Sequence, residues 1–216
     1  MKKVLILSGS PRKGGNSDVL CDEFARGAIE AGNEVEKVRV AEKKIGYCTG
    51  CYYCKDHEGR CALNDDMTEL LQKIIDCDVL VLSSPVYFYS ICAQLKTVLD
   101  RTVARWTEIA NKDLYYIATA AEEDEDTLDI TLSCFHGFAM CINGYEEKGT
   151  LYGKGVYEKG SSLEISSQTE RNTCPFSSSD LNVKLMFSAL IVFTSPFSLM
   201  VSISVIGGSD IPLLGS

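Results

Sequence analysis

The chain lacks an excess of basic residues. It carries 21 Lys and Arg against 30 Asp and Glu over 216 residues, a formal net charge of −9. Because proteins that bind nucleic acids need clustered cations to contact phosphates, this balance argues against a nucleic-acid partner. With 45% hydrophobic and 24% charged residues, the composition is that of an ordinary globular protein. The length suits one well-buried domain rather than two full-sized ones.

A secretory leader is also missing from the first residues. The apolar run there covers only Val4 to Leu7, well short of the roughly 7–15 residues of a signal-peptide core. We therefore expect a cytoplasmic chain with reduced thiols. Its ten cysteines then indicate metal or redox chemistry rather than a disulfide framework.

Charged residues become scarce after residue 160, and residues 185–209 contain none. This stretch exceeds the ~18–20 residues that span a bilayer. However, it is rich in Ser, holds Pro196 and has no basic cluster beyond Lys184, which disfavours a membrane segment. We expect residues 161–216 to form an atypical apolar tail that is buried or disordered. A frameshift or gene fusion near Gly160 to Ser162 is a further hypothesis.

Short apolar runs alternate with amphipathic segments before that point. Strands are predicted around residues 4–7, 35–40, 79–82 and 114–118, and helices around residues 17–31, 67–75, 91–99 and 128–142. Gly32 and Asn33 provide a stop signal for the first helix. Regular alternation of this kind predicts an α/β fold with a doubly wound parallel sheet.

The segment from Ser8 to Ser17, with the sequence Ser-Gly-Ser-Pro-Arg-Lys-Gly-Gly-Asn-Ser, connects the first strand to the first helix. Its hydroxyls and backbone N–H groups, together with the positive end of the helix, can surround a phosphate. No Gly-Lys-Ser/Thr closes it, so it is not a Walker loop, and the dinucleotide fingerprint is absent too. A plain strand–helix turn is the alternative interpretation.

This segment resembles the Gly-Ser-Pro-Arg…Asn-Ser phosphate loop of the NADPH-dependent FMN reductase and iron–sulfur flavoprotein families, and the similarity covers residues 2 to about 160. The resemblance implies a flavodoxin-like sheet with strand order 2-1-3-4-5. It implies one FMN-binding domain in residues 1–160, with a cysteine-rich insert at 48–61. The residues that it assigns to the FMN phosphate are Ser8, Ser10, Arg12, Asn16 and Ser17.

A second segment, from Ser84 to Tyr89, follows the third predicted strand. In a doubly wound sheet of flavodoxin type, ligands bind where the first and third strands end, so this segment is expected beside the first. Its aromatic rings suit a flat ring system, although they are also compatible with core packing. The resemblance implies that Pro85, Val86, Tyr87 and Phe88 line the isoalloxazine. A third contact is expected from the small residues Thr119, Ala120 and Ala121 after the fourth strand.

Four cysteines, Cys48, Cys51, Cys54 and Cys61, lie between the second predicted strand and the second predicted helix. Closely spaced cysteines of this kind can hold one iron–sulfur cluster. The spacing resembles the motif that binds a four-iron four-sulfur (4Fe–4S) cluster in iron–sulfur flavoproteins. Free or disulfide-forming thiols and a zinc site remain open. Asp65 or Asp66 is expected to cap the following helix.

The resulting hypothesis is an FMN-dependent oxidoreductase. Electrons would pass from NAD(P)H or a reduced carrier to a quinone, a flavin or another small acceptor, with the 4Fe–4S cluster as an open participant. No side chain is required as an acid or base, because the cofactor performs the redox step. An electron carrier without turnover and a cysteine-based redox or metal sensor are the alternatives. The resemblance further implies a homodimer or homotetramer, with Arg105 and Trp106 near the contact.

Overall fold

The computed structural model of the protein describes residues 1–122 and 126–159. The expectations for the tail at 161–216 therefore lie outside the described residues. None of the helices in those residues combines the length and the apolar character that crossing a bilayer requires.

The described residues form a twisted sheet whose five longer strands run parallel. Its strands are β1 (Lys3–Ser8), β2 (Glu34–Arg39), β3 (Val79–Tyr87), β5 (Asp113–Thr119) and β6 (Glu146–Gly153), in the order β2-β1-β3-β5-β6. A short strand β4 (Ser90–Ile91) pairs antiparallel with the end of β3. With this hairpin strand set aside, the predicted order 2-1-3-4-5 is confirmed. Strand β6 had no clear sequence signal, because it is a half-exposed edge strand of mixed polarity.

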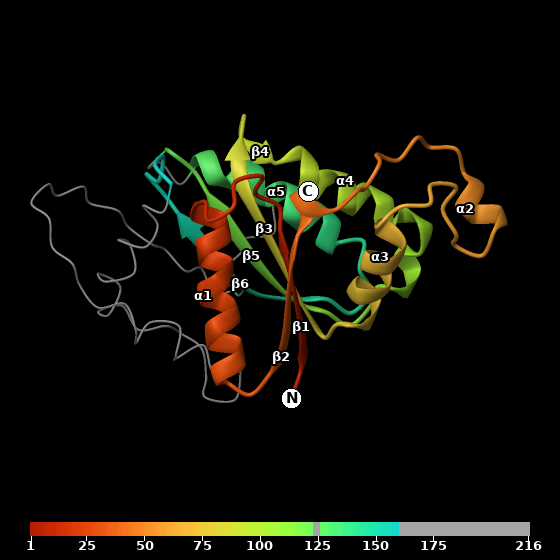
Figure 1. The fold of residues 1–216 in the computed structure, drawn as a ribbon, viewed down its shortest axis with the longest axis horizontal. Coiled ribbons are helices and arrows are strands. Elements are labelled where there is room, and N and C mark those ends of the chain that lie inside the picture. Colours follow the sequence, from red (N-terminus) through yellow and green to blue (C-terminus); the bar gives the residue numbers. More distant parts are fainter. Residues whose placement is uncertain (123–125, 160–216) are drawn as a thin grey trace, which may run out of the picture.

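Five α-helices connect these strands (Figure 1). They are α1 (Asn16–Glu30), α2 (Tyr53–Asp56), α3 (Met67–Asp76), α4 (Ala93–Arg101) and α5 (Asp126–Ala139). The single 3-10 turns η1 (Val40–Glu42), η2 (Thr102–Ala104) and η3 (Trp106–Glu108) complete the connections. The expected end of the first helix is confirmed, since α1 ends at Glu30 and Gly32, after the C-cap Ala31, adopts a φ of 82°, a conformation that glycine tolerates best.

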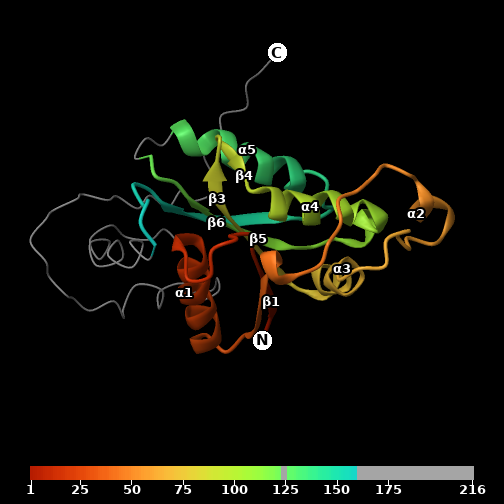
Figure 2. The same cartoon turned by 45° about the horizontal axis from the view of Figure 1, so that its top comes forward.

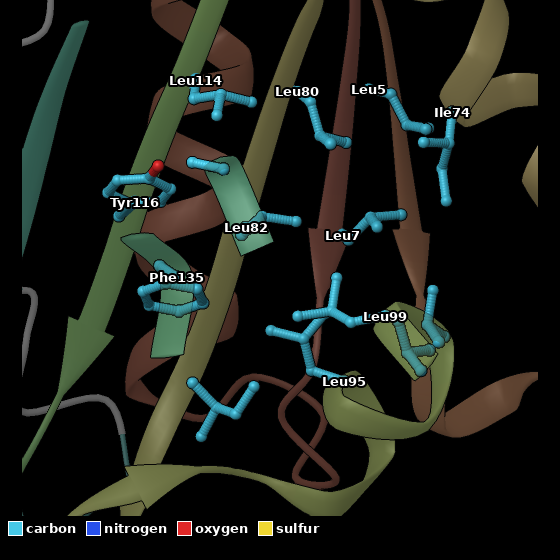
Figure 3. Packing of buried hydrophobic residues seen from close by; sticks show 14 of the residues in the cluster. Leu5, Leu7, Ile74, Leu80, Leu82, Leu95, Leu99, Leu114, Tyr116 and Phe135 are labelled. Carbon is cyan, nitrogen blue, oxygen red and sulfur yellow. The ribbon is translucent and has the colours of Figure 1, made fainter. Parts of the chain in front are cut away.

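Each central strand presents alternate residues to opposite faces of the sheet. Leu5 and Leu7 pack with residues of α3, α4 and α5, whereas Val4 and Ile6 pack against α1. Figure 3 shows the first cluster, with Leu80, Leu82 and Phe135 between the strands and the covering helices. Figure 2 shows α4 and α5 on one side of the sheet and α1 on the other. Among the described elements, α1 is the helix that packs on this second face.

Candidate functional site

The loop between β1 and α1 is packed tightly against the end of β3. The backbone N–H of Gly9 donates to the carbonyl of Ser83 at 2.8 Å, and the thiol of Cys92 donates to the carbonyl of Gly9 at 3.1 Å. A Cβ atom at Gly9 would lie 2.8 Å from both Ser83 O and Cys92 Sγ, closer than real Cβ contacts allow. Glycine is therefore required there, and the close approach brings the first two predicted segments together.

The first turn of α1 faces this loop with backbone donors. Gly15 precedes the helix and offers no side chain to cap it. The first N–H groups of an α-helix have no partner within the helix, and with the helix dipole they favour an anion. The exposed Arg12 lies in the same loop. The loop therefore combines backbone donors, a positive helix end and a cation, as a phosphate requires.

Asp18 stabilises the loop from inside the fold, and no sequence pattern predicted this role. Its carboxylate accepts hydrogen bonds from Ser8 Oγ at 3.0 Å and from the Gly14 N–H at 2.8 Å, and it pairs with Lys37 and Arg39 on β2. Burial disfavours the charged carboxylate, but the hydrogen bonds and the Lys37 charge outweigh burial and lower the pKa of Asp18. The Ser8 hydroxyl is thus bonded to Asp18 rather than presented at the surface of the loop.

Two further predicted residues connect α1 to neighbouring loops. Ser17 Oγ and Thr119 Oγ1 lie 2.6 Å apart, so the start of α1 meets the end of β5. The Asn16 amide donates to the carbonyls of Val156 at 3.2 Å and Glu158 at 2.9 Å. The segment after β6 therefore lies beside the loop, as a fourth segment in addition to the three that the sequence predicted. The sequence did not predict it because only the sheet order places it there.

The second predicted segment forms a β-hairpin rather than an open loop. Strand β3 extends to Tyr87, Val86 pairs with Ile91, and Tyr87 pairs with Ser90. The two turn residues between them, Phe88 and Tyr89, have φ values of 49° and 60°. Such turns favour Asn and Gly, and bulky residues in them are strained. Strain of this kind concentrates at functional sites.

The hairpin tip exposes its aromatic side chains. Phe88 is 100% exposed, and Tyr87 and Tyr89 are 42% and 51% exposed. The base is fixed, because the hydroxyl of Ser84 accepts the Cys92 N–H at 2.8 Å. The aromatic residues are therefore exposed at the tip of a hairpin whose base is fixed by a hydrogen bond. The alternative that they pack in the core is wrong.

The third predicted segment, Thr119 to Ala121, lies next to the segment after β6. The N–H of Ala120 donates to Gly153 O at 2.8 Å, and Val156 N–H donates to Ala120 O at 3.0 Å. Thr119 and Ala120 are buried, whereas Ala121 is exposed. The loops after β1, β3, β5 and β6 thus meet at the carboxyl edge of the sheet, where this class of fold binds its ligands.

The four cysteines that were predicted as cluster ligands line a separate cavity of about 490 Å³. Cys48 and Cys51 are exposed, and Cys54 and Cys61 are partly buried. The Tyr53 N–H and the Thr49 hydroxyl lower the pKa of the Cys51 thiol. Other lining residues include Tyr52, Arg101, Ala104, Arg105 and Trp106. The cysteine segment and α2 project beyond α3 and α4 (Figures 1 and 2).

The cavity fits an iron–sulfur group by donor type, since thiolates are the ligands such clusters take. The described part of the chain nevertheless contains no group of three or more His, Cys, Asp or Glu side chains that could hold a metal ion as placed. His57 is engaged locally, because its ring stacks on Tyr53 with centroids 3.5 Å apart and its Nδ1 lies 2.9 Å from Tyr53 O.

The sheet order and its converging loops define a flavodoxin-like fold. A family model described as NADPH-dependent FMN reductase matches residues 2–135, and the chain belongs to this family. An iron–sulfur flavoprotein of Methanocaldococcus jannaschii is 43% identical over 157 residues, covering 70% of this chain and 80% of that protein. Another, from Archaeoglobus fulgidus, is 46% identical over 101 residues, covering 47% of this chain.

The chain spans 45% of the Archaeoglobus fulgidus protein, and about half the length of most curated relatives it matches. Among solved structures, an NAD(P)H:quinone oxidoreductase from Methanothermobacter marburgensis has a TM-score of 0.55 at 19% identity, covering 72% of this chain and 85% of that one. An azoreductase from Bacillus anthracis has a TM-score of 0.58 at 15% identity, covering 72% and 88%. At these identities the structures support the fold alone.

Proposed function

We propose that this protein is an FMN-binding oxidoreductase whose flavin site lies in the single domain formed by residues 1–160. The observation that carries the proposal is the meeting of four loops at the carboxyl edge of the sheet, joined by the Gly9–Ser83 and Ser17–Thr119 contacts. Family membership and the names of the relatives support FMN as the ligand.

The phosphate of FMN would lie at the start of α1. Ser10, Arg12, Asn16, Ser17 and the first N–H groups of α1 would hold it, with Ser8 acting through Asp18. The anion suits this place because the N-cap Gly15 supplies no capping side chain. Arg12 is exposed beside the helix end, so it can approach the anion without leaving a buried partner.

The ring of FMN would lie between the hairpin and the third segment. Pro85, Val86, Tyr87 and Phe88 would line it on one side, with Thr119, Ala120 and Ala121 at its edge. FMN, when bound, accepts and releases electrons, and the protein supplies position and electrostatics. The rigid base of the hairpin orients the ring, and the exposed aromatic side chains limit the access of water. No residue needs to serve as an acid or base.

The electron donor would be NAD(P)H or a reduced carrier, and the acceptor a quinone, a flavin or another small molecule. The similarity to proteins named iron–sulfur flavoproteins supports a 4Fe–4S cluster held by Cys48, Cys51, Cys54 and Cys61. We further propose a cytoplasmic homodimer or homotetramer. Steady-state NAD(P)H oxidation distinguishes this enzyme from an electron carrier without turnover. An FMN-loaded carrier would show almost none.

Replacing Arg12 tests the phosphate site. Arg12→Ala removes a charged donor, and a charge-assisted hydrogen bond contributes about 1.5–3 kcal/mol, so FMN affinity should fall roughly tenfold or more. Affinity for riboflavin, which lacks the phosphate, should stay unchanged. Lys13→Ala, at the exposed neighbouring position, is the matched control. Equal losses for FMN and riboflavin would place the phosphate elsewhere, and wild-type protein that binds no FMN would refute the proposed function.

A further inference from the structure

The two ends of the cysteine segment are held together at its base. The N–H of Lys44 donates to Asp66 Oδ2 at 2.7 Å, and the N–H of Asp66 donates to Lys44 O at 3.1 Å. The N–H of Gly46 donates to Asp65 Oδ2 at 2.9 Å. These bonds join residues 44–46 to residues 65–66, so the intervening residues, with all four cysteines, form a loop closed at its base.

Arg101 completes this closure from a different element. Its Nη1 donates to Gly46 O at 2.6 Å and to Asp65 Oδ2 at 2.7 Å, and its Nη2 donates to Asp65 Oδ1 at 3.0 Å. The side chain is only 2% exposed. A planar guanidinium can bridge both carboxylate oxygens and a carbonyl at once, which an ammonium cannot do in the same geometry.

Arg101 also belongs to the wall of the cysteine cavity. Cys61 lines the same cavity. Arg105 lines the same cavity but pairs with Glu108 at 2.6 Å near the surface. Of these two arginines, Arg101 is thus the buried cation, and it reaches both ends of the loop.

Helix α4 connects this closure to the proposed flavin site. Directly before α4, Cys92 bonds to Ser84 and to Gly9 of the flavin loops, and the helix ends at Arg101. Its nine residues span about 14 Å at ~1.5 Å per residue. One rigid element therefore has the flavin loops at its first end and the cysteine cavity at its last.

We propose that Arg101 is the positioning residue of the cysteine cavity: held by Asp65, it closes the base of the loop that carries the four thiols, so that a 4Fe–4S cluster bound by them would lie at a fixed place relative to the proposed flavin loops. This inference rests on the cluster-binding part of the proposed function. The buried positive charge would also stabilise the more negative, reduced cluster and so raise its reduction potential, since charge near a cluster is one determinant of that potential.

The experiment compares FMN-loaded wild type with Arg101→Gln, Arg101→Lys, Asp65→Asn and the control Arg105→Gln. Each is reconstituted without oxygen, using ferric iron, a thiol reductant and sulfide. Iron, sulfide and FMN are counted per chain, iron retention is challenged with a chelator, and the cluster potential is titrated. We expect Arg101→Gln and Asp65→Asn to retain iron about tenfold less well, the usual size of a supporting-residue effect at metal sites. FMN content should stay at the wild-type level, and Arg105→Gln should match wild type.

The lysine variant separates geometry from charge. Arg101→Lys keeps the positive charge but loses the planar guanidinium that bridges Asp65 and Gly46. This variant should therefore bind less iron, while its remaining cluster keeps a reduction potential near that of wild type. The residual cluster of Arg101→Gln should have a lower potential. If Arg101→Gln misfolds and loses FMN, iron retention by Arg101→Lys is the deciding measurement. Retention at the wild-type level in Arg101→Lys overturns the inference. An equal loss in Arg105→Gln also overturns it. Wild type that binds FMN but no iron refutes the inference and leaves the flavin function standing.

Discussion

At the scale of single residues, the proposed flavin site depends on groups that hold its loops rather than on groups that would touch a ligand. Gly9 permits the contact between the first loop and the end of β3, and Asp18 fixes the loop from below. Ordinary sequence patterns identify neither role. A glycine and an acid near the start of a helix are common, and only their partners across the fold distinguish them.

Gly9→Ala should destabilise the protein and weaken FMN binding. Its Cβ would lie 2.8 Å from backbone oxygen Ser83 O, and overpacking of this kind costs about 1–3 kcal/mol. Urea denaturation and FMN titration measure the two effects. Gly137→Ala on α5 is the control, because no atom lies within 4 Å of its added methyl, and alanine in a helix should gain about 0.5–1 kcal/mol. Equal stabilities of the two variants would contradict the packing argument.

Asp18 should make stability depend on acid pH. The folded protein lowers its pKa below the ordinary value of 3.8, so the ionised carboxylate stabilises the fold above that value, and this contribution declines as the pH falls through the folded pKa. Wild type should therefore be more stable than Asp18→Asn at pH 7, by a margin that narrows below about pH 4. Denaturation midpoints at several pH values measure this margin.

Asp22→Asn is the control for this prediction. Asp22 also pairs with Lys37, but its side chain is 60% exposed, and exposed ion pairs contribute little. Its substitution should change the midpoint only slightly at any pH. A stability difference between wild type and Asp18→Asn that stays constant from pH 7 to pH 3 would show that the charge of Asp18 is not what stabilises the loop.

At the scale of elements, the β3–β4 hairpin combines local strain with exposure. Phe88 and Tyr89 adopt left-handed conformations that their side chains disfavour, and Phe88 is fully exposed. Stability alone would favour Asn-Gly at such a turn. The presence of two aromatic residues there is explained if their rings serve ligand binding.

Replacing the turn should therefore separate stability from function. The double variant Phe88→Asn with Tyr89→Gly should be more stable by about 2 kcal/mol, because two strained conformations are relieved. It should bind FMN more weakly, because the aromatic surface is lost. Tyr52→Asn is the control: Tyr52 is also exposed with a φ of 59°, so it should gain stability without a change in FMN affinity. A double variant that binds FMN as tightly as wild type would remove the hairpin from the site.

At the scale of the whole molecule, a groove between α4 and α5 lies on the outer surface of the covering helices. Leu99, Val103, Trp106, Phe138 and Ile142 contribute to it, and Val103 and Trp106 are 50% and 47% exposed. Apolar side chains gathered in this way are typical of interaction surfaces. They are consistent with the proposed oligomer, which the resemblance places near Trp106.

Trp106→Glu should shift the protein toward monomer if this face carries the contact. A charge at a buried apolar contact is costly, so light scattering after gel filtration should report a smaller mass at micromolar concentration. Ile29→Glu, on α1 and 59% exposed, should leave the mass unchanged. A Trp106→Glu protein with the wild-type mass would place the contact elsewhere or show that the protein is a monomer.

The sequence by itself determined the fold class, most strand and helix positions and the approximate places of the three loops that we propose for the flavin. Apolar periodicity predicts the elements, and the strand order that the family resemblance implies predicts where their loops meet. Only the tertiary structure revealed the hairpin at Phe88, the place of the segment after β6, the contacts of Asp18 with the first loop and the closure of the cysteine loop by Arg101. These depend on contacts such as Asn16 with Glu158 and Arg101 with Gly46, whose partners lie far apart in the chain, and no local pattern encodes the distance between residues that only folding brings together.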